Sequence, residues 1–301
     1  MSPTLTQNAG PSTNPVRERT RQNAGLLRRR RLVDSTVTVL CALATLIVLA
    51  ALASILFTLV SDGIRGLTFD TLTRVTSPPG SGGGLLNPIL GSIIQTALAT
   101  LIGTPVGLLA GIYLAEYGAG SVIANSVRFV SDMLLSAPSI LVGLFVYLIL
   151  VAPVGHFSGF AGVAALAILV VPIVVRTTED MLRLVPISMR EAAAALGAPR
   201  WKVVLLVSVR AARAGLMTGV LLAVARIAGE TAPLLFTSLG NLNWSVSLAR
   251  PMASLPVTIY QYAGSAYNDW VQLAWTSALL ITTGVLLINI IARLGLRRQD
   301  R

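Results

Sequence analysis

The feature that most constrains this chain is a series of apolar runs of the length that crosses a lipid bilayer. A helix of about 20 apolar residues spans the roughly 30 Å of hydrocarbon in a membrane. Six spans are predicted, at about residues 33–60, 88–113, 132–151, 160–175, 214–236 and 271–291. With 54% hydrophobic and only 12% charged residues, the chain lies outside the range of soluble domains. The sequence therefore predicts an all-α, polytopic membrane protein.

The basic residues predict how the spans are oriented. With the N-terminus inside the cell, 19 of the 23 Lys and Arg residues fall in cytoplasmic segments and three in outer loops. Cytoplasmic loops of membrane proteins carry such an excess of Lys and Arg. Both termini and residues 177–213 are therefore predicted to be cytoplasmic. The net charge of +11 then indicates a membrane and its lipids, not nucleic acid, as the partner.

The first 31 residues differ from the rest of the chain. They are polar, rich in Ser, Thr, Asn and Pro, and end in the basic run Arg28 to Arg31. This composition predicts a disordered cytoplasmic arm at residues 1–31, followed by a transmembrane domain at residues 32–301.

Three glycines mark one face of the second predicted span. Gly103, Gly107 and Gly111 are spaced four residues apart, so they lie on the same side of a helix. Small residues in this pattern let a neighbouring helix approach closely. The pattern predicts a tightly packed helix pair and no ligand.

The cytoplasmic stretch contains a helix-forming segment with a sharp break. Residues 188–196 favour a helix, Gly197 interrupts it, and Pro199 suits the first turn of a second helix. The stretch predicts a short helical hairpin, whose small alanines would let a partner approach its backbone. On physical grounds alone, an ordinary charged loop is an equal alternative.

The fifth predicted span contains a pair of charged residues. Arg226 and Glu230 are four residues apart, so on one helix they share a face. Charged residues inside a span cost about 2.5–3.5 kcal/mol each on insertion scales, and they usually mark function. One interpretation is a structural ion pair. The other is an anion site, because a guanidinium offers paired donors that match phosphate or carboxylate oxygens.

The carboxylate suggests how an anion site could select its ligand. An ionised Glu230 only accepts hydrogen bonds, and phosphate at neutral pH still has an O–H to donate, whereas sulfate does not. We therefore hypothesise that Glu230 favours phosphate over sulfate.

The hairpin segment resembles a known loop. Residues 191–198, EAAAALGA, are similar to the EAA loop of the permease subunits of ABC importers. The matching residues are Glu191, Ala192, Ala193 and Gly197. The chain departs from the usual pattern further on, at Val207, Val209 and Arg210. The resemblance implies that the matching residues form a coupling helix, which docks on a cytoplasmic ATPase subunit.

Four longer segments narrow the resemblance to the permeases of phosphate importers: GIYLAEYG (111–118), APSILVGLF (137–145), VVRTTEDMLRLVP (174–186) and LLAVARIAGETAPLLFT (221–237). The resemblance implies the ABC type I importer permease fold, a place in the bacterial plasma (inner) membrane, and a role for Arg226 and Arg176 in moving phosphate. For Arg176, the general excess of arginine at cytoplasmic helix ends is the alternative explanation.

The resemblance also implies the partners. These are a second homologous permease, a pair of ATPase subunits and an extracytoplasmic phosphate-binding protein, which the outer loops would receive. The Trp and Tyr residues of those loops are equally typical of membrane-interface anchors. The chain is not expected to hydrolyse ATP or hold a cofactor, because its single lysine, Lys202, does not lie in a G-x-x-x-x-G-K-[ST] motif.

Other functions remain as alternatives at this point. A permease for another oxyanion would differ only in selectivity, and a secondary transporter or channel would need no ATPase. A membrane enzyme is disfavoured because G-x-S-x-G and H-E-x-x-H motifs are absent from the sequence. The lone His156 and the lone Cys41 predict no metal site.

Overall fold

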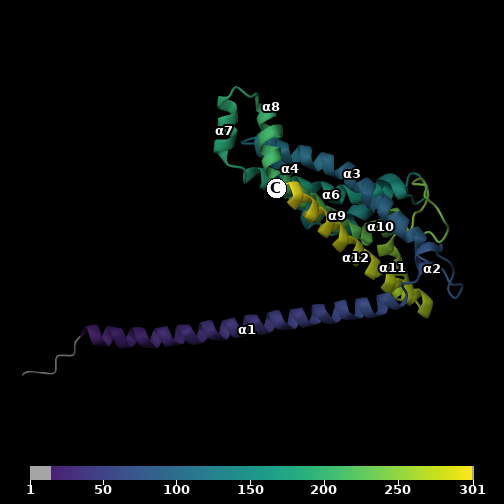
Figure 1. The fold of residues 1–301 in the computed structure, drawn as a ribbon, viewed down its shortest axis with the longest axis horizontal. Helices are drawn as coiled ribbons and strands as arrows, with labels where there is room; N and C mark the ends of the chain where they lie inside the picture. Colours follow the sequence, from purple (N-terminus) through teal and green to yellow (C-terminus); the bar gives the residue numbers. More distant parts are fainter. Residues whose placement is uncertain (1–14, 300–301) are drawn as a thin grey trace, which may run out of the picture. The chain divides into compact units, whose positions relative to one another are not determined.

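A computed structural model describes residues 15–299, and every regular element in this range is helical (Figure 1). The chain divides into two compact units, Met1–Thr58 and Leu59–Arg301. The elements are α1 (Pro15–Arg65), α2 (Phe69–Thr73), α3 (Leu86–Glu116), α4 (Val122–Ser136), α5 (Ser139–Val146), the π-helix η1 (Tyr147–Val151), α6 (Gly159–Arg183), α7 (Ile187–Ala195), α8 (Arg200–Lys202), the π-helix η2 (Val203–Ser208), α9 (Val209–Ala228), α10 (Ala232–Thr237), α11 (Leu255–Ala263) and α12 (Asn268–Gln299). Among residues 15–299, five helices are long and apolar enough to cross a bilayer, and counting the bent pair of α4 with α5 and η1 as one span gives six.

The first unit consists of most of α1. The side chains from Leu32 to Phe57 are all exposed, as suits an apolar helix that faces lipid or another protein. Residues 1–14 of the predicted arm lie outside the described residues. From Pro15 onward the chain is helical, where the sequence predicted an arm up to residue 31. Nine of residues 15–31 are Arg or Leu, which favour a helix, and α1 extends back through them.

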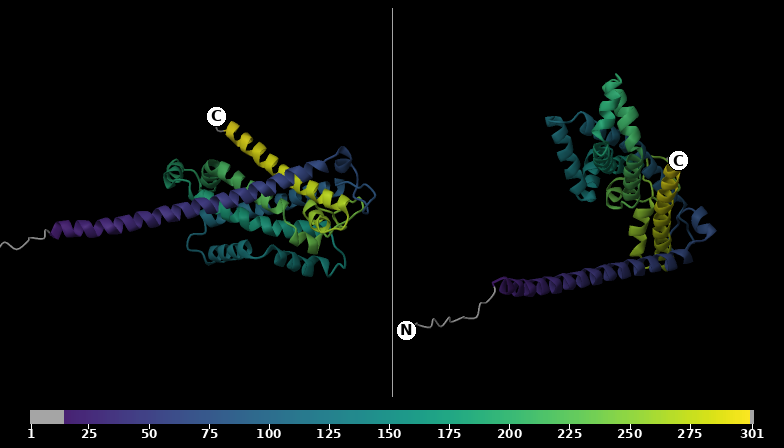
Figure 2. Two further views of the ribbon diagram at one scale, coloured as in Figure 1. Left: turned by 90° about the horizontal axis from the view of Figure 1, so that it is seen from below. Right: turned by 60° about the vertical axis from the view of Figure 1, so that its left-hand side comes forward.

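The core of the second unit surrounds α6. Nearly three quarters of its most apolar stretch is buried, a larger share than in the other candidate spans. Leu166, Val170 and Ile173 of α6 pack in one cluster with Ala223 and Ile227 of α9. Both views in Figure 2 show α6 inside the bundle. The central helix therefore sets the positions of its neighbours.

The predicted close approach at the three glycines is confirmed. Gly103, Gly107 and Gly111 of α3 are buried against Val170, Val174 and Thr178 of α6. A methyl group added at any of them would lie 2.5–2.8 Å from an α6 side chain. Only glycine allows the two helices to run this close together.

The third predicted span, at residues 132–151, is not one straight helix. The chain runs through α4, bends by 106°, and continues into α5 and η1. Ala137 adopts an extended backbone, with φ −69° and ψ 140°, immediately before Pro138. Proline has no backbone N–H and disfavours helical geometry in the residue before it. The helix therefore ends at Ser136.

The fifth span also differs from the prediction of residues 214–236. It begins earlier, because α8, η2 and α9 form one apolar helical run from Arg200 to Ala228. It ends at Ala228, and residues 229–231 separate it from the short α10. Pro233 explains the break, because its ring would clash with the carbonyl of Gly229 if the helix continued.

The predicted cytoplasmic segment, residues 177–213, is mostly helical. α6 extends to Arg183, beyond the predicted end at residue 175, and α7 and α8 form a hairpin that projects from one end of the bundle (Figures 1 and 2). Gly197 has a φ of +80°, which a residue with a side chain rarely adopts. The predicted break at this glycine and the restart after Pro199 are both confirmed.

Candidate functional site

Arg226 and Glu230 lie beside the break in the fifth span. Arg226 is in the last turn of α9, and Glu230 follows the end of that helix. The prediction that both belong to one helix is wrong, but the turn at Gly229 keeps them close. The Nε of Arg226 is 3.8 Å from the Oε1 of Glu230. A cation in the last turn of a helix is favoured by the partial negative charge of the terminal carbonyls.

The two side chains of this pair are far apart for an ion pair and are partly exposed. The side chain of Arg226 is 41% exposed and that of Glu230 is 16% exposed. A separation of 3.8 Å exceeds the 2.7–2.9 Å of a charge-assisted hydrogen bond. The guanidinium therefore keeps donors that an incoming anion can use.

Arg176 lies in the middle of a group of carboxylates. Its Nε is 3.3 Å from the Oδ2 of Asp180, and its Nη1 is 3.8 Å from the Oδ1 of Asp132 on α4. Its side chain is 50% exposed. The sequence predicted that the span ends just before Arg176. Because α6 continues to Arg183, Arg176 instead lies within the helix.

The structure does not pair the two arginines. Thr177, next to Arg176, packs against Gly219 of α9. Arg226 lies seven residues further along α9, which corresponds to about 10 Å along the helix axis. The two guanidinium groups therefore occupy successive levels of the bundle, each with its own carboxylate.

The hairpin residues form an exposed surface. Glu191, Ala192 and Gly197 are exposed, Ala193 is half-buried, and Leu196 beside them is 90% exposed. Ile187, Met189 and Trp201 of the hairpin are exposed as well. Several exposed apolar side chains on one element are typical of a surface that another protein covers.

Sequence reasoning missed a second Arg–Glu pair. Glu179 of α6 is 2% exposed, and its Oε1 accepts hydrogen bonds from Arg183 and, at 2.8 Å, from the Nε of Arg128 on α4. Arg128 also donates to Asn125 and to the carbonyl of Leu114. Arg128 and Glu179 are 51 residues apart, so no local spacing could reveal the pair.

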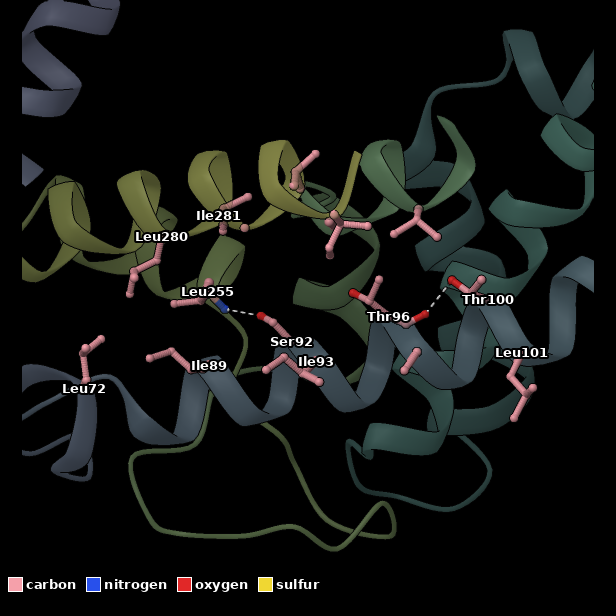
Figure 3. Close-up of a pocket in the computed structure, with 16 residues that line it drawn as sticks. Leu72, Ile89, Ser92, Ile93, Thr96, Thr100, Leu101, Leu255, Leu280 and Ile281 are labelled. Carbon is pink, nitrogen blue, oxygen red and sulfur yellow. Dashed lines mark hydrogen bonds between the residues drawn. The ribbon is translucent and has the colours of Figure 1, made fainter. Parts of the chain in front are cut away.

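The larger cavity described is lined by none of the predicted site residues Arg226, Glu230 and Arg176. It has a volume of about 640 Å³ and lies between α3, α9, α11 and α12 (Figure 3). Its walls are nearly all apolar, and its few hydroxyls belong to Ser92, Thr96 and Thr100 of α3. Figure 3 shows the hydroxyl of Ser92 accepting a hydrogen bond from the backbone N–H of Leu255, and that of Thr100 donating to the carbonyl of Thr96. Without a charged donor, this cavity suits a hydrocarbon surface.

The outer aromatic residues pack partly on one another. Tyr262 is buried and stacks on Trp270, with ring centroids 4.2 Å apart. Burial raises the pKa of Tyr262, and the carboxylate of Asp269 adds to the effect. Both lie beside a cavity of about 330 Å³, whose polar residues include Asn241 and Gln261. Trp244 and Tyr260 are exposed and remain available to lipid or a partner.

Comparison with known proteins places this arrangement in a family. Residues 103–301 match the family of binding-protein-dependent transport system inner membrane components. The chain is also 59% identical over 240 residues to the phosphate transport system permease protein PstA of Yersinia pestis, which covers 79% of this chain and 81% of that protein. The chain belongs to this transport family, in its PstA branch.

Other PstA proteins match over more of their length. The chain is 53% identical to the PstA of Pasteurella multocida, covering 90% of this chain and 97% of that protein. It is 34% identical to PstA 1 of Mycobacterium tuberculosis H37Rv over 89% of this chain and 88% of that protein. The matches therefore extend N-terminal to the family domain.

A solved structure shows the same fold. The inward-facing MetNI methionine ABC transporter contains a chain that superposes with a TM-score of 0.59 at 22% identity, over 72% of this chain and 96% of the other. The all-helical bundle therefore has the permease fold of ABC importers, and the chain is a transport component, as other members of its family are. The family membership and the apolar helices identify a multi-pass membrane protein.

Proposed function

We propose that this chain is the membrane-spanning permease subunit of an ATP-driven importer, and that it moves inorganic phosphate across the bacterial inner membrane. The observation that carries the proposal is the 53% identity to a phosphate transport system permease over nearly the whole length of that protein. Its partners would be a second homologous permease, two ATPase subunits that hydrolyse the ATP, and an extracytoplasmic phosphate-binding protein.

In this function, Arg226 binds the anion beside the break between α9 and α10. Its half-exposed guanidinium has only a long contact with Glu230, so phosphate oxygens can replace that contact with shorter, paired hydrogen bonds. Arg176, about two helical turns nearer the cytoplasm, takes the next position. There Asp132 and Asp180 hold the guanidinium and limit how tightly it can retain the anion.

The hairpin converts the ATPase cycle into movement of the bundle. Its exposed residues Glu191, Ala192 and Gly197, together with Ala193, would dock on the ATPase. Because α7 follows directly on α6, and α8 leads through η2 into α9, a shift of the hairpin acts on both helices that carry the arginines.

Uptake of labelled phosphate into vesicles tests the proposal. Vesicles containing the complete co-purified complex should take up phosphate only with ATP. Arg226→Gln should abolish uptake, because the neutral amide removes the charge that balances the anion, while the ATPase still co-purifies. Arg30→Gln is the matched control, since Arg30 is exposed on α1, outside the predicted outer loops, and should leave uptake unchanged.

The outcomes separate the alternatives. ATP-independent uptake would identify a secondary transporter or channel. Strong competition by unlabelled sulfate in the wild type would identify a permease for another oxyanion. Undiminished uptake by Arg226→Gln would make the Arg226–Glu230 contact a structural ion pair.

Glu230→Gln tests the selectivity of the site. In the wild type, sulfate should meet the carboxylate without a proton to share, and be excluded by orders of magnitude. The amide can donate to sulfate, so the variant should let sulfate compete for phosphate uptake. Continued exclusion of sulfate by this variant would contradict the role given to Glu230.

A further inference from the structure

Three arginines converge on the last turn of α3. The Nη2 of Arg128 donates to the carbonyl of Leu114 at 3.1 Å, and the Nη2 of Arg200 donates to the carbonyl of Glu116 at 2.6 Å. The Nη2 of Arg190 lies 3.1 Å from the Oε1 of Glu116. The last carbonyls of a helix have no partner within the helix and carry partial negative charge. This end of α3 is therefore a site where cationic side chains are held.

Two of these arginines come from the hairpin. Arg190 is on α7 and Arg200 is on α8, so each arm of the hairpin contacts Glu116. The guanidinium of Arg200 also lies over the ring of Tyr117, 4.7 Å from its centroid. Arg200 and Glu116 are 84 residues apart in sequence. The hairpin thus has a tertiary attachment to α3 in addition to its chain connections to α6 and α9.

The contact with Arg190 is shielded from solvent. The Glu116 side chain is 8% exposed and that of Arg190 is 23% exposed. Arg190 also donates to the carbonyl of Leu182 at the end of α6. Charges are screened less when they are partly buried. Removing the carboxylate would leave Arg190 near the end of α3 without its counter-charge.

The same turn of α3 connects to the anion residues. Arg128, which binds the carbonyl of Leu114, is one helical turn before Asp132 on α4. Asp132 is the residue that contacts Arg176. Contacts therefore run without a gap from the hairpin, through the end of α3 and along α4, to Arg176.

We propose that Glu116 is a positioning residue, which fixes the coupling hairpin to α3 so that movement of the ATPase reaches α3 and α4 as well as α6 and α9. This inference rests on the proposed function, because it assumes ATP-driven transport. Without the Glu116 carboxylate, α7 would lose its ion pair with α3, and the bond of Arg200 to the backbone carbonyl would fasten only the α8 arm of the hairpin. ATP hydrolysis would then continue while the bundle responded less.

The experiment compares transport with hydrolysis in the complete complex. The complex is placed in vesicles, and the uptake of labelled phosphate and the hydrolysis of ATP are measured on the same sample. Glu116→Gln should lower the phosphate taken up per ATP by roughly fivefold or more, the range of an ordinary coupling free energy between sites. The ATPase should still co-purify. Asp34→Asn, which removes an exposed carboxylate of α1 outside the predicted outer loops, is the matched control and should keep the wild-type ratio.

A charge exchange separates positioning from folding. Glu116→Arg and Arg190→Glu should each lose coupling, and the double variant should recover at least half of the wild-type ratio, because the attraction is restored with reversed signs. If the single variants fail to assemble, recovery of assembly and uptake in the double variant supports the proposal, and failure to recover contradicts it.

Two further outcomes are decisive. A wild-type ratio in Glu116→Gln would overturn the role of Glu116 and leave the proposed function intact. A wild-type complex that takes up no phosphate with ATP would overturn the proposed function, and this inference with it.

Discussion

Two of the Arg–Glu pairs in the bundle have opposite properties. In the first pair, the Nε of Arg128 lies 2.8 Å from the Oε1 of Glu179, and the side chain of Glu179 is 2% exposed. In the second pair, the Nε of Arg226 lies 3.8 Å from the Oε1 of Glu230, and the side chain of Arg226 is 41% exposed. The first pair has its hydrogen bonds filled by neighbouring groups. The second keeps donors available.

The depth of burial decides what each pair can do. A buried pair that loses one partner leaves an uncompensated charge, so it holds helices in place. An exposed, long pair contributes little to stability and costs little to open. In the proposed function a substrate anion would displace Glu230 from Arg226, whereas the contact between Arg128 and Glu179 is short and buried.

The largest effect is expected for Glu179→Ala. It leaves Arg128 without its buried partner, so the folded complex should lose about 3–5 kcal/mol of stability. Thermal melting of the detergent-solubilised complex, followed by size-exclusion chromatography, measures the loss.

Asp180→Ala serves as the matched control for this change. Asp180 is the next residue, but its side chain is 47% exposed and its pair with Arg176 lies at the surface of the bundle. It should change stability by less than about 1 kcal/mol. Equal losses for the two variants would remove the distinction between buried and open pairs.

A smaller effect is expected for Gly107→Ala in the contact between α3 and α6. The new methyl would lie 2.7 Å from the Cβ of Val174, so the helices that frame the buried pair must separate. Overpacking of this kind costs about 1–3 kcal/mol. The melting temperature of the complex should fall accordingly.

Gly284→Ala on α12 is the control for the glycine change. Apart from its chain neighbours and the nearby backbone of α12 itself, no atom lies within 4 Å of the position of its added methyl. The variant should therefore keep or slightly raise the melting temperature, because alanine favours a helix over glycine. A clear drop there would show that another helix covers this face of α12 in the complex.

The smallest stability effect is expected for Arg226→Gln, although it should abolish uptake. Removing one partner of a long, half-exposed pair should change stability by about 0.5 kcal/mol or less. The melting temperature and the uptake assay, measured on one preparation, check both statements. A large fall in melting temperature would place this pair in the same structural class as Arg128 and Glu179.

Local patterns predicted much of the fold. The apolar runs placed the helices, because a bilayer leaves few alternatives to a continuous helix. The spacing of Gly103, Gly107 and Gly111 predicted a close helix contact, and the break at Gly197 predicted the hairpin. Each of these depends on residues that are near one another in sequence, which is why the pattern was sufficient.

The breaks in the spans were harder to predict. Pro138 and Pro233 lie within apolar runs, so a prediction from hydrophobicity alone continues the helix past them. Proline inside a membrane helix is tolerated in some contexts, as at Pro105 within α3 and Pro172 within α6. Whether a proline ends a helix therefore depends on how the residues after it pack against neighbouring helices.

The sequence by itself therefore determined the helices, the expected orientation of the chain, and the residues that carry its few charges. The tertiary structure decided which groups meet: Arg128 with Glu179, Arg190 with the carboxylate of Glu116, Arg200 with the backbone carbonyl of Glu116, and Arg176 with Asp132. These partners are 44 to 84 residues apart and lie on separate helices. The packing around α6 brings them together, and burial then distinguishes the closed pairs from the open pair that the proposed function assigns to the anion.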